Sequence, residues 1–366
     1  MEKGNATLHF LDRYLGVPAI LFLGLSKVFK NRLPDFFSPK RVAILNISSI
    51  GDNVLMSAPI QDLRTRFPQA EIILFCGNTN YGVAKMLPGL DAVHMLPVTQ
   101  VLSSAKYIRS FGRFDLMIDF GPWPRLNALL SFFFRAKFKI GFRSTSQFRH
   151  YIYDYAVLHS AEKHELDNFR ALLAPLHIQA VSDPQLIVPA HMQPPVEKPY
   201  LVFHPWPGGY KSYRKEWAVL NWVALAEKLG PLPYAIYITG AAADLEASES
   251  LEQKSSGRLK SMAGKLNLTE TALLVKNAEL LVSVNTGIMH LGAAFDVPLV
   301  ALHGPTSVKR WGPVSTKAIN LFPKGEGCGY LHFGYEYNKS DVDCMALISV
   351  EEVQKAIFEQ LKAYVN

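Results

Sequence analysis

The chain has 366 residues and a mass of 40.9 kDa, which is too long for one ordinary core and fits two domains of roughly 150 residues each. Apolar residues make up 49% of it and charged residues 19%, which excludes a mainly disordered chain, because disorder needs low hydrophobicity and high charge. A formal net charge of +7 favours an anionic partner, and three cysteines are too few for a disulfide framework, so a reducing cytoplasm is the expected compartment.

The longest apolar run, LGVPAILFLGL at 15–25, is interrupted by Pro18 and is shorter than the roughly 20 residues that span a bilayer. Basic residues follow it, among them Lys30 and Arg32, whereas a signal peptide carries its charge before the apolar run. Residues 1–40 are interpreted either as an amphipathic segment in the membrane interface or as a segment packed on the protein's own surface.

From Arg41 onward, strand and helix patterns alternate. Strand, short loop, helix and strand within about 35 residues form a βαβ unit, which implies a parallel sheet. We assign residues 41–181 to an N-terminal domain. Its predicted strands are 41–48, 71–77, 91–97 and 114–120, and its predicted helices are 53–67 and about 100–110.

Residues 182–199 contain five prolines and no helical period, which indicates a linker. The alternation then restarts in a second domain, residues 200–348, and an amphipathic helix in 349–366 closes the structure. The predicted fold class is therefore α/β, with two doubly wound domains that face a central cleft. In the second domain we predict strands at 200–205, 234–240, 280–285 and 298–304, and helices at 216–230, 269–277 and from Gly287.

The first candidate site is SSIGD at 48–52. It stands at the carboxyl end of the first predicted strand, where open α/β sheets bind their ligands. Gly51 permits a tight turn after Ser49. Asp52 fits two roles, a helix cap or a catalytic carboxylate in the cleft, and the local pattern leaves both open.

The second candidate site is a glycine-containing loop that carries Lys211, Arg214 and Lys215 between a strand and a helix. Backbone N–H groups, a helix N-terminus and cationic side chains of such a loop can hold phosphate oxygens; a solvated basic loop is the alternative. The spacing differs from a P-loop, and no G-x-G-x-x-G follows a strand, which disfavours a dehydrogenase.

The third candidate site is NTGIMHLGAA at 285–294, where a predicted strand again ends in a turn of small residues that opens a helix. Such a turn suits a diphosphate. His290 either belongs to this site or is a core histidine satisfied by internal hydrogen bonds.

Other chemistries are disfavoured. Neither C-x-x-C, H-E-x-x-H nor G-x-S-x-G occurs, so we expect no metal, no cofactor and no serine nucleophile. Nine Lys or Arg lie among aromatic residues between Ser103 and His150. This stretch is interpreted as a surface for an anionic lipid or phosphorylated glycan, or as a solvated face. Because no nucleic-acid-binding motif accompanies it, we expect no nucleic-acid partner.

Together the three clusters, in this order, resemble glycosyltransferase family 9, the heptosyltransferases of lipopolysaccharide assembly. The likeness covers about residues 41–360 and is strongest in ILNISSIGDNVLMSAPIQDLRTRFPQAEI and VSVNTGIMHLGAAFDVPLVALHGPTSVKRWGP; the tail that contains Cys328 and Cys344 is also similar. The resemblance implies a GT-B fold of two Rossmann-like domains, with residues 41–181 on the acceptor side and residues 200–348 binding the nucleotide sugar. It also implies inverting, metal-independent transfer of a heptose, usually from ADP-heptose, to a lipid-linked glycan at the cytoplasmic face of the bacterial inner membrane.

The resemblance also implies roles for single residues. Asp52 would be the general base, Lys215 in Lys-Glu-Trp a phosphate contact, and Thr286 and Gly287 the backbone contacts to the diphosphate. Less closely matched are Asp244, at the position of a ribose contact, and Leu266, at the adenine pocket.

Asn285 departs from the family, which usually carries Asp at this position in contact with the donor sugar. Asn keeps the shape and can still form hydrogen bonds, but it removes a negative charge. The departure leaves three alternatives open: another nucleotide sugar as donor, a non-catalytic member that binds a glycan or nucleotide sugar, or an epimerase on the same scaffold. If the resemblance holds, residues 1–40 and the basic stretch are expected to face an anionic membrane. This predicts that membrane association is sensitive to salt.

Overall fold

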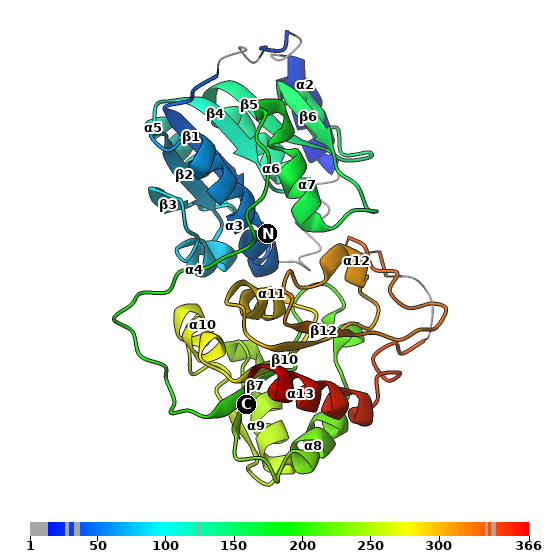
Figure 1. Ribbon diagram of the computed structural model, residues 1–366. Coiled ribbons are helices and arrows are strands. Elements are labelled where there is room, and N and C mark those ends of the chain that lie inside the picture. The colour runs from blue at the N-terminus through cyan, green and yellow to red at the C-terminus, as the bar shows by residue number, and fades with distance from the viewer. Residues whose placement is uncertain are drawn as a thin grey trace. The chain divides into compact units, whose positions relative to one another are not determined.

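The computed structural model describes residues 14–25, 29–32, 37–122, 125–333, 336–337 and 342–365. The chain divides into two compact units, Met1–Gln185 (unit 1) and Leu186–Asn366 (unit 2), each of which is described by itself (Figure 1). Between the last helical turn of unit 1 and the first strand of unit 2, residues 182–199 form neither helix nor strand.

Unit 1 contains a parallel sheet in the order β3-β2-β1-β4-β5-β6. The strand order reverses between β1 and β4, and such a reversal marks the ligand-binding point of doubly wound sheets. Buried apolar and aromatic side chains, Phe75 and Phe114 among them, fill the core beneath the sheet. The elements are β1 (Arg41–Asn46), α3 (Ile50–Arg66), β2 (Glu71–Cys76), η2 (Asn78–Asn80), α4 (Tyr81–Ala84), β3 (Ala92–Met95), α5 (Val101–Ser110), β4 (Arg113–Asp119), α6 (Arg125–Phe133), β5 (Arg135–Arg143), η3 (Arg149–Tyr151), β6 (Tyr155–Leu158), α7 (Glu165–Ala171) and η4 (Ala174–Leu176).

Unit 2 repeats this strand order in its own parallel sheet, β12-β11-β10-β7-β8-β9, with the reversal between β7 and β10. Trp217 and Trp222 pack edge to face in its core, with ring centroids 5.1 Å apart. The elements are β7 (Tyr200–His204), η5 (Ser212–Lys215), α8 (Val219–Lys228), β8 (Ala235–Ile238), η6 (Ala242–Asp244), α9 (Leu245–Lys254), β9 (Leu259–Ser261), α10 (Leu268–Lys276), β10 (Leu280–Val284), α11 (Gly287–Ala294), β11 (Leu299–Leu302), α12 (Val308–Trp311), β12 (Ala318–Leu321) and α13 (Val350–Tyr364).

The predicted α/β class with two doubly wound sheets is confirmed. The interpretation of the basic stretch is wrong for part of it, because β5 runs through its middle as an interior strand. Lys139 and Arg149 are buried. Lys139 Nζ donates to the carbonyl oxygens of Ser131 and Phe132, at 2.7 and 3.0 Å, so this ammonium group is bound within unit 1 instead of facing a membrane.

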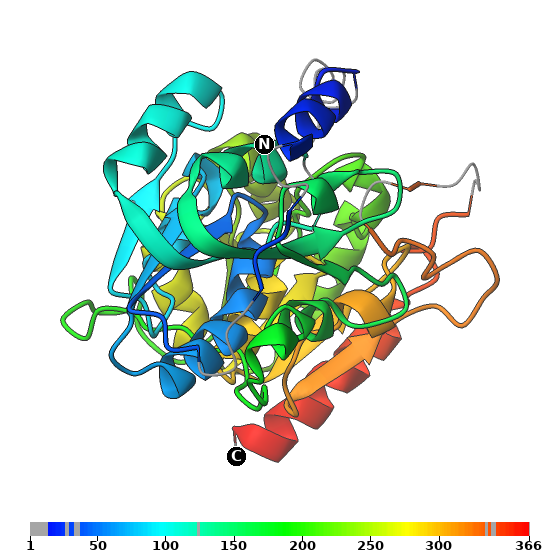
Figure 2. The same ribbon diagram turned by 90° about the horizontal axis from the view of Figure 1, so that it is seen from above.

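The apolar N-terminal run forms α2 (Gly16–Gly24), which packs against α6 and η3. It buries one stripe, Gly16, Ile20 and Gly24, because residues four apart lie on the same face of a helix. The opposite side leaves Phe22 73% exposed. Figure 2 shows this dark-blue helix at the margin of the view. Among the residues that are placed, no helix is long and apolar enough to cross a bilayer.

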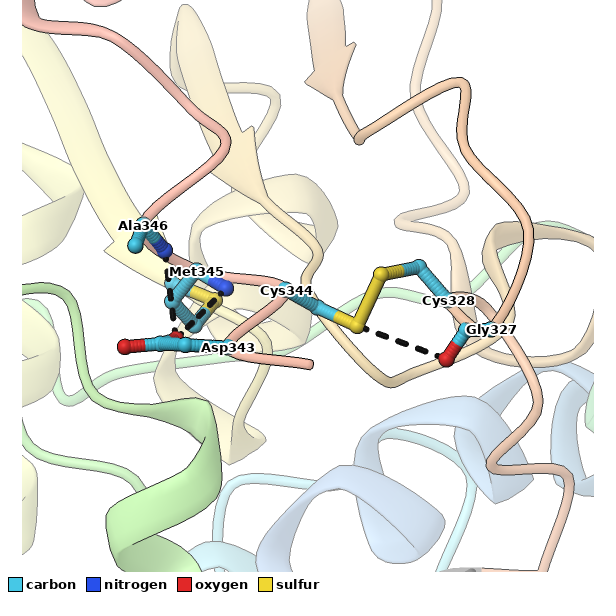
Figure 3. Close-up of a disulfide and its surroundings, with 6 residues drawn as sticks. All are labelled: Gly327, Cys328, Asp343, Cys344, Met345 and Ala346. Carbon is cyan, nitrogen blue, oxygen red and sulfur yellow. Dashed lines mark hydrogen bonds between the residues drawn. A yellow bond between two sulfur atoms is a disulfide. The ribbon is translucent and has the colours of Figure 1, made fainter. Parts of the chain in front are cut away.

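Cys328 and Cys344 form a disulfide (Figure 3). The loop that it closes is tied to the turn after β11, because Leu331 N donates to the carbonyl oxygen of Pro305 at 2.8 Å. Cys76 is a free, buried thiol, and burial raises its pKa to about 12. The chain therefore has a single cross-link in unit 2 instead of a disulfide framework.

Candidate functional site

The turn between β1 and α3 fixes the Asp52 carboxylate. Ser49 is the N-cap of α3, and its N–H and Oγ both donate to Asp52 Oδ2, at 3.0 and 2.8 Å. Gly51 and Asp52 are buried in the first turn of the helix, with Asp52 6% exposed. The capping role is therefore observed, and it holds the carboxylate in one orientation at the strand-order reversal of unit 1.

A buried ionic cluster, which the sequence analysis did not identify, ends the neighbouring strand β4. Asp119 is fully buried, and its Oδ2 accepts a hydrogen bond from Arg149 Nη2 at 2.8 Å. Burial raises the pKa of the Tyr153 phenol, which also donates to this oxygen. Two further donors, Gly121 N at 2.9 Å and Asn127 Nδ2 at 3.1 Å, reach Asp119 Oδ1. In the sequence, Asp119 is one of only two acidic residues, with Asp115, in a stretch otherwise rich in basic residues.

In unit 2, the turn between β10 and α11 carries Asn285, Thr286 and Gly287. Thr286 is the extended N-cap of α11, whose first N–H groups lack intrahelical partners, as at every helix start. Asn285 Nδ2 donates to the Trp311 carbonyl oxygen at 3.1 Å and lies 2.9 Å from His303 Nδ1. His290 is buried on α11, 4% exposed.

His303, which the sequence places in the third candidate region without a role of its own, follows β11 and is fully buried. Its Nε2 lies 2.9 Å from Asn320 Oδ1 on β12. Burial disfavours the imidazolium ion and lowers the pKa of His303 to about 4. Asn285 is therefore part of a neutral polar cluster, in contrast to the ionic cluster of unit 1.

The three basic residues of the loop after β7 each have contacts of their own. Lys211 has a left-handed backbone conformation, φ 48°, and its Nζ lies 5.5 Å from the centre of the Tyr210 ring. Hydrogen bonds with the Tyr213 and Tyr330 hydroxyls raise the pKa of Arg214. Lys215 Nζ donates to the carbonyl oxygen of Gly208 at 2.9 Å, so its ammonium group points back over the loop.

Asp244 lies beside this loop. Its Oδ2 accepts a hydrogen bond from Ala241 N at 2.7 Å. Burial and then the Asp244 carboxylate raise the pKa of Glu216, so the two acidic side chains are neighbours. Gly264 N donates to the Gly240 carbonyl oxygen at 3.2 Å, which brings the half-exposed Leu266 to the same edge of the sheet.

Comparisons with known proteins agree with this architecture. The profile of "Glycosyltransferase family 9 (heptosyltransferase)" matches residues 106–329. A lipooligosaccharide heptosyltransferase 2 of Haemophilus influenzae is 24% identical over 314 residues, which cover 76% of this chain and 87% of that protein. Two solved structures have the same fold. The ADP-heptose lipopolysaccharide heptosyltransferase II of Escherichia coli has a TM-score of 0.71 and 20% sequence identity, over 89% of this chain and 100% of that one. A family 9 glycosyltransferase of Veillonella parvula has a TM-score of 0.74 and 21% identity, over 88% of this chain and 97% of that one.

The profile covers more than half of the chain, and the relative from Haemophilus influenzae aligns across most of both proteins. The fold comparisons extend the likeness to both Rossmann-like units and confirm the GT-B class. The chain therefore belongs to glycosyltransferase family 9, the heptosyltransferase family, and is a glycosyltransferase.

Proposed function

We propose that this enzyme transfers a heptose from ADP-heptose to a lipopolysaccharide-type acceptor, with inversion at the anomeric carbon. The observation that carries the proposal is a pair of strand-to-helix turns beside the strand-order reversals of the two sheets, one after β1 and the other after β10. One holds a buried carboxylate, Asp52, and the other a helix start without a carboxylate, at Thr286 and Gly287. The names of the Haemophilus influenzae and Escherichia coli relatives supply the sugar and the acceptor class.

Asp52 is proposed as the general base. It takes the proton from the acceptor hydroxyl while that oxygen forms a bond to the anomeric carbon, and the bond from this carbon to the diphosphate breaks with its electron pair. The hydrogen bonds from Ser49 to Oδ2 favour this role, because they hold the carboxylate in one orientation before the acceptor arrives.

The developing charge on the diphosphate needs donors in unit 2. We propose that the backbone N–H groups of Thr286 and Gly287 and the ammonium group of Lys215 supply them, and that Lys215 exchanges its bond to the Gly208 carbonyl for a phosphate oxygen. Lys211 and Arg214 belong to the same loop as Lys215 and add positive charge near the diphosphate. Asp244 accepts a hydrogen bond from a ribose hydroxyl, and Leu266 packs against the adenine base.

The decisive variant is Asp52→Asn, which keeps the shape of the side chain but cannot accept the proton. We expect turnover with ADP-heptose and an acceptor glycan to fall by about 10²–10⁴, with donor binding unchanged. Asp62→Asn is the matched control, since Asp62 is also buried on α3 but receives the N–H groups of Val181 and Ser182. Equal turnover of Asp52→Asn and the native enzyme would remove Asp52 from the chemistry.

The donor is tested by titrating ADP-heptose, ADP-glucose and UDP and GDP sugars against the purified enzyme. Selective binding of ADP-heptose supports the proposal, and preference for another nucleotide sugar moves the enzyme to another glycan with the same mechanism.

We also propose peripheral contact with the inner face of the bacterial inner membrane. The exposed side of α2 carries Leu21, Phe22 and Leu25, which are 44%, 73% and 68% exposed, and apolar side chains on one face of an interfacial helix bind the acyl boundary. Exposed basic residues of unit 1, Lys106 and Arg109 on α5 among them, add attraction to anionic headgroups.

Phe22→Glu with Leu25→Glu should abolish sedimentation with phosphatidylglycerol vesicles, whereas Leu102→Glu, at an exposed apolar position of α5, should not. High salt releases a purely electrostatic contact, and retention in high salt assigns the binding to α2. Binding of the double variant at the native level would contradict the role of α2.

A further inference from the structure

A continuous line of side chains crosses three neighbouring strands of unit 2. Asn285 follows β10, His303 follows β11 and Asn320 lies on β12, and the sheet order places these strands side by side. Asn285 Nδ2 lies 2.9 Å from His303 Nδ1, and His303 Nε2 lies 2.9 Å from Asn320 Oδ1. Asn285 N and His303 N also donate to the carbonyl oxygens of Leu302 and Leu321, at 3.0 and 2.8 Å, which fixes their backbones at the sheet edge.

The Trp311 carbonyl sets the direction of every hydrogen bond in this line. A carbonyl oxygen only accepts, so the Asn285 side-chain atom 3.1 Å from it must be the NH₂ group. An amide nitrogen does not accept hydrogen bonds, so His303 Nδ1, 2.9 Å from it, must be the acceptor nitrogen of the ring. The same NH₂ group also has a longer contact with Met289 Sδ, at 3.8 Å, which does not alter this assignment. Nε2 then carries the proton and donates to Asn320 Oδ1. Burial, which lowers the pKa of His303 to about 4, agrees with a neutral ring.

One polar atom of Asn285 remains for a ligand. In the part of the chain that the structure describes, every hydrogen bond of the side chain uses Nδ2, and the residue is half-buried at the turn that opens α11. We propose that His303 is a positioning residue, which turns the Asn285 oxygen toward the donor so that it accepts a hydrogen bond from a hydroxyl of the sugar. This inference rests on the proposed donor site at that turn.

The arrangement makes Asn285 a specificity residue of a defined kind. An acceptor held by buried partners favours a sugar with a hydroxyl at the contact point and disfavours the deoxy analogue, because the analogue leaves the acceptor without a donor. His303 contributes without touching the sugar.

Titration calorimetry with ADP-heptose and ADP tests the proposal. His303→Leu should weaken binding of ADP-heptose about three- to tenfold, the cost of one poorly aligned hydrogen bond, and leave binding of ADP, which has no heptose, unchanged. His303→Gln, which can still accept from Asn285 and donate to Asn320, should restore most of the loss. In an Asn285→Ala background His303→Leu should have no further effect, because a residue that acts through another shows no independent contribution.

A purely structural role gives a different pattern. Gln360→Leu removes hydrogen bonds from α13 to the carbonyl oxygens of Leu299 and Lys317, at 3.4 and 3.1 Å. It therefore disturbs β11 and the start of β12, the strands of His303 and Asn320, without reaching Asn285. The proposal is wrong if His303→Leu changes the affinities for ADP-heptose and ADP in the same way as Gln360→Leu does. It is also wrong if His303→Leu weakens the binding of ADP and of ADP-heptose equally.

The tautomer of His303 separates this inference from the proposed function. Nitrogen NMR of the ligand-free enzyme should show a neutral ring protonated at Nε2, and Asn285→Ala should perturb its Nδ1 resonance. A ring protonated at Nδ1 overturns the positioning role whatever the donor is. Failure of the native enzyme to bind ADP-heptose overturns the donor and the sugar contact, while the tautomer still decides whether His303 orients Asn285.

Discussion

The two units have the same strand order, yet the buried groups near its reversal are charged in unit 1 and uncharged in unit 2. In unit 1 the ends of β1 and β4 carry Asp52 and the buried pair of Asp119 and Arg149. In unit 2 the ends of β7, β10 and β11 carry His204, Asn285 and His303, and burial lowers the pKa of both histidines to about 4. The buried groups at the edge of unit 1 are ionic, and those at the edge of unit 2 are neutral.

A carboxylate beside the acceptor hydroxyl is needed to remove a proton, which is the role proposed for Asp52. At the donor turn, Asn285 stands where the family resemblance implies Asp, so the missing charge is particular to this chain. Asn285 keeps hydrogen bonding at the donor turn without that charge. The topology therefore supplies the location of both sites, and a few side chains decide the chemistry of each.

The ionic edge should be the easier to break. Arg149→Met leaves the Asp119 carboxylate buried without its counter-charge, which should lower the free energy of unfolding of unit 1 by about 3–5 kcal/mol. Hydrogen exchange of the β4 and β5 amides measures this. Lys137→Met is the control, because its ion pair with Asp115 is exposed on the lysine side and such pairs contribute about 0–1 kcal/mol. Equal stability of the two variants would mean that Asp119 is not held by charge.

The neutral edge should instead be sensitive to acid. Because the pKa values of His204 and His303 are lowered from 6.5 to about 4 in the folded state, the unfolded chain binds more protons between these values. The stability that they contribute is complete above about pH 6.5 and is lost as the pH falls toward 4, by at most roughly 3 kcal/mol for each residue. Tryptophan fluorescence of urea unfolding reports mainly on unit 2, which holds four of the five tryptophans, and His303→Gln should flatten the pH dependence of that unfolding. An unchanged slope in that variant would show that His303 is not the titrating group.

Making the neutral edge ionic sharpens the comparison. Asn285→Asp places a carboxylate oxygen against the Trp311 carbonyl, which now faces Nδ2 at 3.1 Å. We expect a loss of about 1–3 kcal/mol in the stability of unit 2 near pH 8, the cost of an unsatisfied buried acceptor. The loss should shrink as the pH falls, because a protonated His303 would donate to the new carboxylate and its pKa should rise well above 4. An NMR titration that finds the His303 pKa unchanged would contradict this account.

The sequence predicted both edges but not their character. Strand-to-helix turns at Asp52 and at Asn285 are local features, so their positions were readable from apolar runs and small residues. The partners that give them their character are remote: Arg149 is 30 residues from Asp119 and His303 is 18 from Asn285. Basic residues at 139 and 149 suggested a surface, and only the fold shows that backbone carbonyls and Asp119 bind them inside unit 1.

The smallest expected effect compares two helix caps of the same design. Ser49 and Ser349 each begin a helix, and each Oγ donates to the carboxylate three residues on, Asp52 at 2.8 Å and Glu352 at 2.7 Å. Ser→Ala at either cap should cost about 0.5–2 kcal/mol of stability, measured as the shift in the urea midpoint. Two structural differences accompany the proposed difference in use. Asp52 is buried, whereas Glu352 is exposed, and Ser349 Oγ also accepts a hydrogen bond from the Glu352 N–H.

Turnover separates them. Ser49→Ala removes the hydrogen bond from Ser49 Oγ to Asp52 Oδ2 and keeps that of the Ser49 N–H. The proposed base becomes less well oriented, so turnover should fall about tenfold, the cost of roughly 1.4 kcal/mol. Ser349→Ala should leave turnover unchanged, because Glu352 lies at the start of α13 in unit 2 and only caps its helix. If both variants keep full turnover while losing the same stability, Ser49 is a cap alone, and the orientation of Asp52 depends on the backbone N–H that remains.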